Sequence, residues 1–237
     1  MKNAAQTTPP LAQLLLILSF TTGLVDAISV LGLGKVFTAN MTGNIVFLGF
    51  AVADAPGFSV APYLLAIACF LIGAVAAGLA GSRLKPGPLR RWLNLSAVIE
   101  AALLWIAAAV AIGFDVAAQE TKIQLYAIIA LTAIAMGYRN GTIRQLKIPD
   151  LTTTVLTLTL TGLAADSRIA GGSNPNWLRR CAAVLCIFAG AATGATLVLI
   201  YGLAIPLALT GMIILCSTLL FSVHPKSGQS GFTEPRG

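Results

Sequence analysis

Two carboxylic acids stand inside long apolar stretches of the sequence, where acids are rare. Asp26 lies in the apolar run 11–34, and Glu100 lies in the run 92–114. A carboxylate at membrane depth costs about 2.5–3.5 kcal/mol on insertion scales, so each acid is a functional candidate by default. We predict proton coupling through Asp26 or Glu100. Two structural alternatives stay open: Asp26 as a cap for backbone N–H groups, and Glu100 as a hydrogen-bonding residue.

Amide and hydroxyl side chains gather in two short segments, 37–54 and 151–165. Within each segment they recur at one-turn spacing, so they share a face if the segment is helical. Such a face lines a solute pathway or hydrogen-bonds a neighbouring helix. We favour the first role. The predicted substrate-binding residues are Asp26, Asn40, Thr42, Asn44, Asn140, Thr154 and Thr157.

Arg139 and Arg144 flank Asn140 just beyond the apolar run 123–138, at what we expect to be the end of a helix. A guanidinium group there could bind an anionic substrate. The commoner outcome is that a long basic side chain reaches out to the lipid headgroups.

No residue pattern indicates an enzyme or a cofactor site. The four cysteines fall inside apolar runs and His224 is the single histidine, so we predict no metal site and no structural disulfide. There is no Ser/His/Asp or Cys/His set and no nucleotide fingerprint. We therefore expect a protein that is not an enzyme and has no cofactor, while a lipid-acting enzyme stays open as an alternative.

The composition indicates a membrane protein. Of the 237 residues, 57% are hydrophobic and 10% are charged, whereas soluble domains carry about 25% charged residues. The net charge of +7 comes from Lys and Arg in short connectors without interleaved aromatic residues. We read these as topology signals and lipid contacts and expect no nucleic-acid partner.

Eight apolar runs can be marked, and none has the period of a strand. They span residues 11–34, 37–54, 58–82, 92–114, 123–138, 151–165, 178–203 and 205–223. The polar ends, 1–10 and 224–237, are predicted to be disordered tails. We divide the rest into a first membrane repeat, 11–114, and a second, 123–223.

The division rests on internal similarity at a nearly constant offset. GLVD at 23–26 aligns with GYRN at 137–140, the Thr-rich stretch 37–46 with 152–161, and CFLIGAVAAG at 69–78 with CIFAGAATGA at 186–195. The small residues of the last pair predict close helix packing, and a homodimer through the same faces is an open alternative.

The placement of Lys and Arg indicates how many runs cross the membrane. If all eight cross, the basic residues divide almost evenly between the two sides. If each of 37–54 and 151–165 instead leaves the membrane on the side from which it entered, only Lys35 and Lys122 lie outside. The other thirteen of the fifteen basic residues lie on the same side of the membrane as both termini. Because cytoplasmic loops carry the Lys/Arg excess, we predict six full spans, two short re-entrant or broken helices and cytoplasmic termini. Three spans per half would make the repeats inverted, as in many secondary transporters.

GLVDA at 23–27 followed by FTANMTGN at 37–44 resembles the YoaK-like family of bacterial membrane proteins. The resemblance extends over about residues 11–223, although Thr157-Leu158 stands where the family often has Thr-Gly. It implies a six-span topology and no particular substrate.

These features predict an all-helical, multi-pass protein of the bacterial inner membrane. We interpret it as a small transporter that moves an unidentified small solute through a site between the repeats, with the proton coupling predicted above. A passive channel and a non-transport membrane protein, such as an assembly partner, remain the alternatives.

Overall fold

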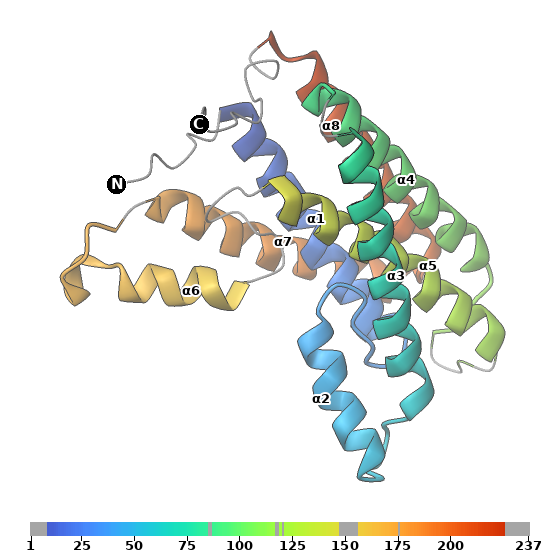
Figure 1. Cartoon of the computed structure of the whole chain (residues 1–237). Helices are drawn as coiled ribbons and strands as arrows, with labels where there is room; N and C mark the ends of the chain where they lie inside the picture. Colours follow the sequence, from blue (N-terminus) through green and yellow to red (C-terminus); the bar gives the residue numbers. More distant parts are fainter. Residues whose placement is uncertain are drawn as a thin grey trace.

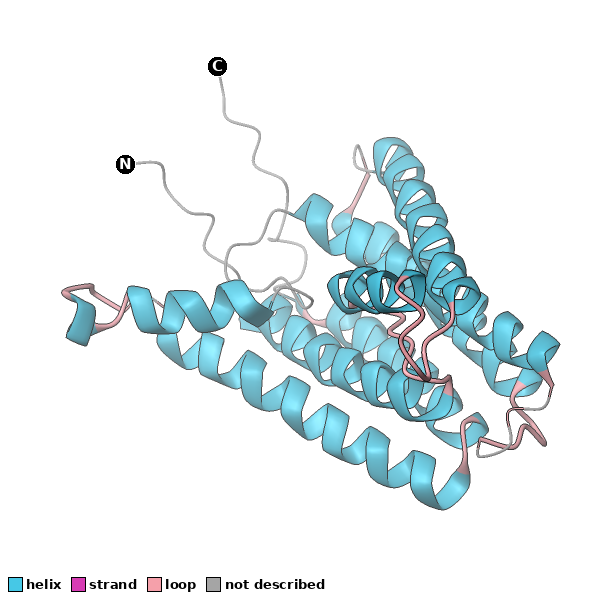
Figure 2. Ribbon diagram, turned by 90° about the horizontal axis from the view of Figure 1, so that it is seen from below, coloured by secondary structure: helices cyan, strands magenta, loops and turns pink. Residues whose placement is uncertain are grey.

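The regular structure of the protein is helical throughout the described part of the chain. The computed structural model describes residues 9–84, 87–116, 119, 121–146, 156–174 and 176–225, and Figure 2 draws these residues as helices and loops. The predicted tails lie mostly outside these ranges. Pro9 and Pro10, which we had assigned to the N-terminal tail, begin the first helix, where proline costs no hydrogen bond.

Among the described residues, six α-helices are 20 to 25 residues long, and two are about half that length (Figure 1). The long helices are α1 (Pro9–Gly32), α3 (Val60–Leu84), α4 (Leu89–Val110), α5 (Lys122–Leu146), α7 (Trp177–Tyr201) and α8 (Ala204–Val223). The short ones are α2 (Met41–Val52) and α6 (Leu156–Ala165), and a 3-10 turn, η1 (Arg168–Ala170), follows α6.

Five of the six long helices are long and apolar enough to cross a membrane, and α5 is the exception because it carries more polar residues. Their outer faces are apolar. On α3 and α7, Leu71 and Phe188 are 58% and 71% exposed. Contiguous apolar surface of this kind would be unstable in water and is the natural surface toward lipid.

The helices pack in pairs that repeat between the two halves of the chain. Helix α3 lies along α5 and α7 lies along α1, while α4 packs against α8. Helix α4 also contacts α5, as α8 contacts α1. Exchanging the two halves therefore turns each of these helix contacts into another one of the set, and the α4–α8 contact into itself.

Glycines allow the two closest pairs to approach. Gly73 of α3 faces the backbone of Ile134 and Tyr138 on α5, and Gly190 of α7 faces the backbone of Phe20 and Leu24 on α1. A Cβ at either glycine would overlap a backbone carbonyl oxygen of the partner helix. Gly137 and Gly23 meet α3 and α7 in the same way. Backbone-to-backbone packing through small residues is typical of membrane helices.

As far as the structure describes them, the two short helices are shorter than a bilayer is thick. At 1.5 Å per residue, α2 and α6 extend about 18 and 15 Å, against a hydrocarbon core of about 30 Å. Helix α2 packs on α3 and α6 packs on α7. Of the predicted segment 151–165, residues 151–155 lie outside the described part of the chain. In the first half, the loop before α2 returns to the depth of Asp26, because the backbone N–H of Ala39 faces that carboxylate.

Polar side chains stabilise this turn of the chain. Asn44, in the first turns of α2, accepts a hydrogen bond from Phe37 N (2.9 Å) and donates one to Phe37 O (2.5 Å). Asn40 is the N-cap of α2 and accepts from Gly43 N at 3.5 Å. The segment therefore satisfies its backbone groups locally, as any non-helical backbone at membrane depth must.

Candidate functional site

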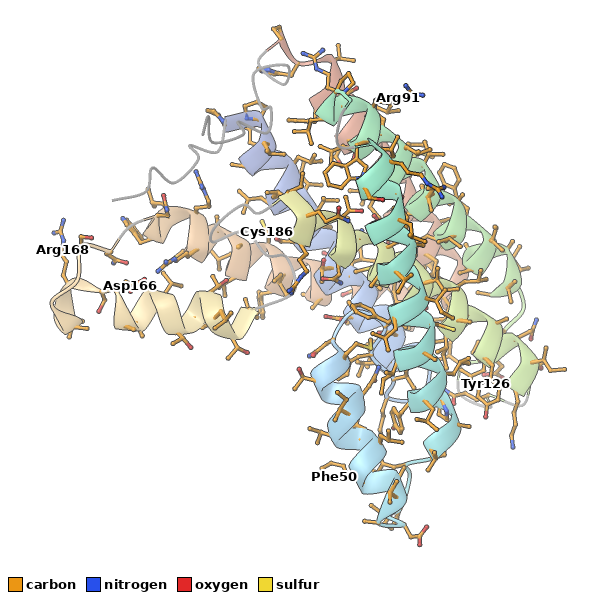
Figure 3. The ribbon with its side chains drawn as sticks, in the orientation of Figure 1. Phe50, Arg91, Tyr126, Asp166, Arg168 and Cys186 are labelled. Carbon is orange, nitrogen blue, oxygen red and sulfur yellow. The ribbon has the colours of Figure 1, made fainter. Side chains whose placement is uncertain are left out.

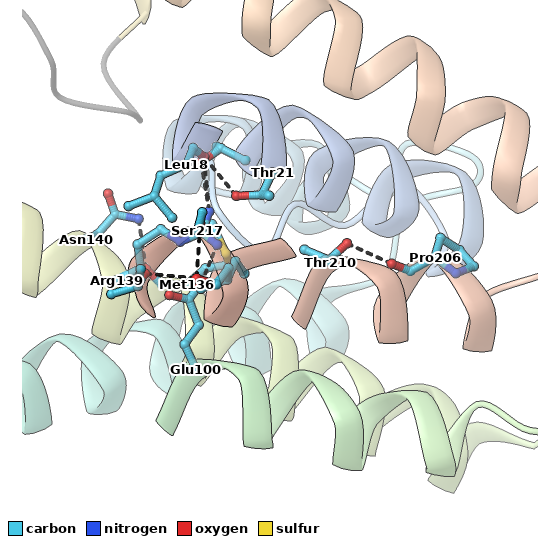
Figure 4. A network of polar contacts seen from close by, with 12 residues as sticks. Leu18, Thr21, Glu100, Met136, Arg139, Asn140, Pro206, Thr210 and Ser217 are labelled. Atoms are coloured by element: carbon cyan, nitrogen blue, oxygen red, sulfur yellow. Dashed lines mark hydrogen bonds and ion pairs between the residues drawn. The ribbon is translucent and has the colours of Figure 1, made fainter. Parts of the chain in front are cut away.

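A buried ion pair joins α5 to α4 near the middle of the bundle (Figure 4). Arg139 Nη2 contacts Glu100 Oε1. Its Nη1 donates to Leu18 O (3.3 Å) and to Thr22 Oγ1 (3.1 Å) on α1. Arg139 and Glu100 are only 2% and 4% exposed. One guanidinium group thus ties together α1, α4 and α5.

The position of Arg139 differs from our expectation because α5 does not end near residue 138. The helix continues to Leu146, so Arg139 lies within it and points into the bundle instead of toward lipid headgroups. The continuation has a packing reason: Gly137 and Gly141 let this part of α5 lie against α3. Arg144 is exposed on the same helix.

Asp26 lies close to the ion pair. It interacts electrostatically with Arg139, and the backbone N–H of Ala39 faces its carboxylate. Its Oδ1 is buried and has no hydrogen-bond partner among the described residues. The contact with Ala39 is of the kind expected from a residue that caps backbone N–H groups, and proton coupling through Asp26 stays a prediction.

A cavity of about 30 Å³ opens beside the ion pair, between α1, α4, α5 and α8. Leucines of α1, including Leu11, Leu14 and Leu15, form its apolar wall. Its polar lining consists of Ser96, Glu100, Arg139, Thr142 and Thr218. A cavity of this size has room for about two water molecules.

None of the predicted substrate-binding residues that the structure describes, Asp26 included, lines the cavity. Asn44 is buried against the backbone of Phe37, and Asn140 donates to Met136 O (2.9 Å) within its own helix. Thr42 and Thr157 are exposed on α2 and α6. Asn40 caps α2, and Thr154 lies outside the described residues. The structure therefore brings together Asp26 and Glu100 through Arg139, and not the Thr/Asn faces.

A second ion pair stabilises the α6–α7 corner. Arg180 Nη1 lies 2.7 Å from Asp166 Oδ2, and Gly162 of α6 faces the same guanidinium group. Figure 3 shows Asp166 and Arg168 at this corner, apart from the α1–α4–α5 bundle. The pair is partly exposed, so we assign it a structural role.

Metal ligands do not gather in the described residues, where no three His, Cys, Asp or Glu side chains form a group.

Sequence reasoning identified Glu100 and Asp26 separately but missed Arg139 as their common partner. A general signal was available, since a buried carboxylate within a membrane bundle requires a cationic or hydrogen-bonding partner. It did not single out Arg139, which is one of several basic residues that directly flank an apolar run.

Comparison with known proteins identifies relatives. The family model described as "Protein of unknown function (DUF1275)" matches residues 14–220. The UPF0700 transmembrane protein YoaK of Bacillus subtilis (strain 168) is 36% identical over 157 residues, which are 65% of this chain and 65% of that protein. The chain thus aligns with somewhat less than two thirds of that relative's length. No solved structure matches the chain.

Proposed function

Since the chain belongs to the DUF1275 family of multi-pass, YoaK-like transmembrane proteins, whose description assigns no function, we propose one from its structure. We propose that the protein is a small transporter of the bacterial inner membrane. It moves a small solute through a site between its two halves, with proton coupling at Glu100.

The buried Arg139–Glu100 pair carries this proposal. Ionisable residues in the middle of apolar helices are costly, and in membrane proteins they mark substrate and proton pathways. Glu100 belongs to the first half and Arg139 to the second. Protonation of Glu100 would remove the attraction between them and so change the contact between the halves.

The reciprocal helix packing supports an inverted-repeat transporter. The pairs α1–α7 and α3–α5 use equivalent glycines, and each half has one short helix packed on its third element. Transporters with inverted repeats hold their solute at the interface between the repeats and move one repeat against the other. In this proposal, six helices cross the membrane. Helices α2 and α6 are re-entrant, and each of them enters and leaves the membrane on the same side.

The distribution of basic residues supports the orientation. With α2 and α6 re-entrant, twelve of the fifteen Lys and Arg residues fall on the side of both termini, which the positive-inside rule assigns to the cytoplasm. Lys35 and Lys122 fall on the other side, and Arg139 lies within the bundle.

Flux measurements in liposomes test the proposal. The purified full chain, reconstituted with a pH-sensitive dye inside, should acidify the lumen when a transported solute is supplied from an acidic exterior. Glu100→Gln should abolish the proton signal, because an amide cannot carry a proton across, while Asp26→Asn should reduce it. Asp54→Asn, in an exposed loop, is the matched control and should behave like the wild type.

Two results would contradict the proposal. One is the absence of flux for every solute in a broad panel of ions, acids, amines and sugars. The other is solute flux that ignores the proton gradient, which would favour a passive channel.

A further inference from the structure

The lining of the cavity favours one class of solute. Arg139 uses Nη1 for Leu18 O and Thr22 Oγ1 and Nη2 for Glu100. Its Nε is buried and has no hydrogen-bond partner among the described residues. The Nε and Nη2 groups form one edge of the guanidinium plane, which is the edge that binds two oxygens of a carboxylate at once. The contact with Glu100 uses the Nη2 group of that edge and leaves the Nε group without an acceptor in the described part of the chain.

Hydroxyl groups add donors beside this edge. Thr142 Oγ1 is buried without a hydrogen-bond partner among the described residues, and the residue is 4% exposed. Ser96, whose hydroxyl lies near that of Tyr138, also lines the cavity. A buried donor without an acceptor is costly, so these groups would bind an acceptor that enters the cavity.

We propose that the transported solute is a small monovalent anion that binds the Nε–Nη2 edge of Arg139 in place of Glu100. The inference rests on the transport function proposed above and names the substrate class of the same site. Thr142 and Ser96 donate hydrogen bonds to the anion. With room for about two water molecules, the cavity suits an anion of the size of chloride, formate or nitrate.

Charge balance couples the anion to a proton. When the anion takes the place of the Glu100 carboxylate, that carboxylate takes up one proton from water and becomes a neutral acid. The charge of the site is then the same before and after the exchange. This matters in an apolar bundle, where an unpaired charge is expensive.

The groups around Glu100 are consistent with this exchange. Glu100 faces Arg139 of α5. The acid of α1 is Asp26, which also interacts electrostatically with Arg139. Helix α8 contributes Ile214 and Thr218 to the cavity, which are not ionisable. Among the described residues that line the cavity, Glu100 is the one acid. A cation entering there would instead face the guanidinium group.

Binding measurements on the purified full chain test the inference independently of transport. Sodium formate, nitrate and chloride are titrated calorimetrically into the protein in detergent micelles. Choline chloride tests whether binding follows the anion and not sodium, and sodium gluconate tests whether a larger anion is excluded. We expect saturable binding of the small anions that weakens about tenfold per pH unit on the alkaline side, because one proton enters with each anion.

Variants separate an anion site from a structural ion pair. Glu100→Gln, which mimics the protonated acid, should bind formate at least as tightly as the wild type and with no dependence on pH. Thr142→Val should weaken binding about tenfold or more, since it removes a hydrogen bond to a charged group. Arg139→Gln should abolish binding, and Arg144→Gln, an exposed arginine of the same helix, should leave it unchanged.

If the variants of the ion pair fail to fold, Thr142→Val and the pH dependence of anion binding to the wild-type protein still decide. The inference is overturned if the small anions do not bind, if Glu100→Gln loses binding as a merely structural pair would, or if Thr142→Val leaves affinity unchanged. Flux of a neutral or cationic solute without anion binding would overturn this inference and leave the transport proposal intact. Anion binding without any flux would overturn the transport proposal and leave the anion site.

Discussion

At the scale of single residues, the central feature is an arginine shared by two acids. Arg139 contacts Glu100 directly and interacts with Asp26. One positive charge cannot fully compensate two negative ones, so either acid is a candidate proton carrier in the proposed mechanism. Breaking such a buried pair by removing one partner typically costs about 3–5 kcal/mol, because it leaves an unpaired charge.

The two single variants of the pair should therefore differ in stability. Glu100→Gln leaves Arg139 charged, because a guanidinium group stays protonated, whereas Arg139→Gln leaves a carboxyl group that can become neutral. We expect Glu100→Gln to lower the melting temperature more. Thermal unfolding in micelles, in a buffer without small anions, shows which of the two variants has the lower melting temperature.

The double variant Glu100→Gln/Arg139→Gln provides the control for this comparison. The double variant should lose less stability than the two single variants lose in sum, since it removes both charges together. Strictly additive losses would mean that the two side chains do not interact in the folded protein.

At the scale of helices, the continuation of α5 to Leu146 decides where the chemistry lies. The polar stretch from Arg139 to Thr142 would end a helix on a surface. Here Arg139 and Thr142 are buried, because Gly137 and Gly141 fit against α3 and Arg139 Nη1 finds acceptors on α1. Several buried hydroxyls elsewhere are satisfied within their own helices, as Thr132 by Ile128 O (2.6 Å) and Thr210 by Pro206 O (2.7 Å).

Two glycines of α3 form a matched pair for testing this packing. Gly73→Ala should destabilise the protein by about 1–3 kcal/mol, the usual cost of overpacking a tight contact, because the new Cβ meets the Ile134 carbonyl. Gly78→Ala, with open space around the position, should be neutral or stabilising by up to about 1 kcal/mol. Melting temperatures of the two variants in micelles measure the difference, and equal effects would contradict the close α3–α5 approach.

At the scale of the whole molecule, the re-entrant arrangement fixes which loops face which side of the membrane. In the described part of the chain, two helices are shorter than a bilayer is thick, and each packs on a neighbouring long helix. If both are re-entrant, the loop after α2 faces outward and the loop after η1 faces the cytoplasm.

Cysteine accessibility in cells checks this topology. In a background with Cys69, Cys181, Cys186 and Cys216 replaced by alanine, a membrane-impermeant maleimide should label Asp54→Cys from outside. It should label Ser173→Cys only after the cells are opened. Labelling of Asp54→Cys only in opened cells would instead indicate that all eight runs cross the membrane.

The sequence by itself determined the class of the protein and most of its helices. Apolar runs of about 20 residues with few charges must be buried or face lipid, and the ends of α1, α3, α4, α7 and α8 agree with the predicted runs to within a few residues. The repeated glycines were also visible, because close packing requires small residues at fixed spacing. The family relationship followed from the same motifs.

Only the tertiary structure decided where the site lies. An ion pair between Glu100 and Arg139 depends on how α4 and α5 pack, and that packing is not encoded in the spacing of either residue. The Asn and Thr residues show the converse: their spacing suggested a lining, yet Asn40 and Asn44 hold the loop before α2. A polar side chain at membrane depth must be satisfied by some partner, and three-dimensional packing selects whether that partner is the backbone, another side chain or a solute.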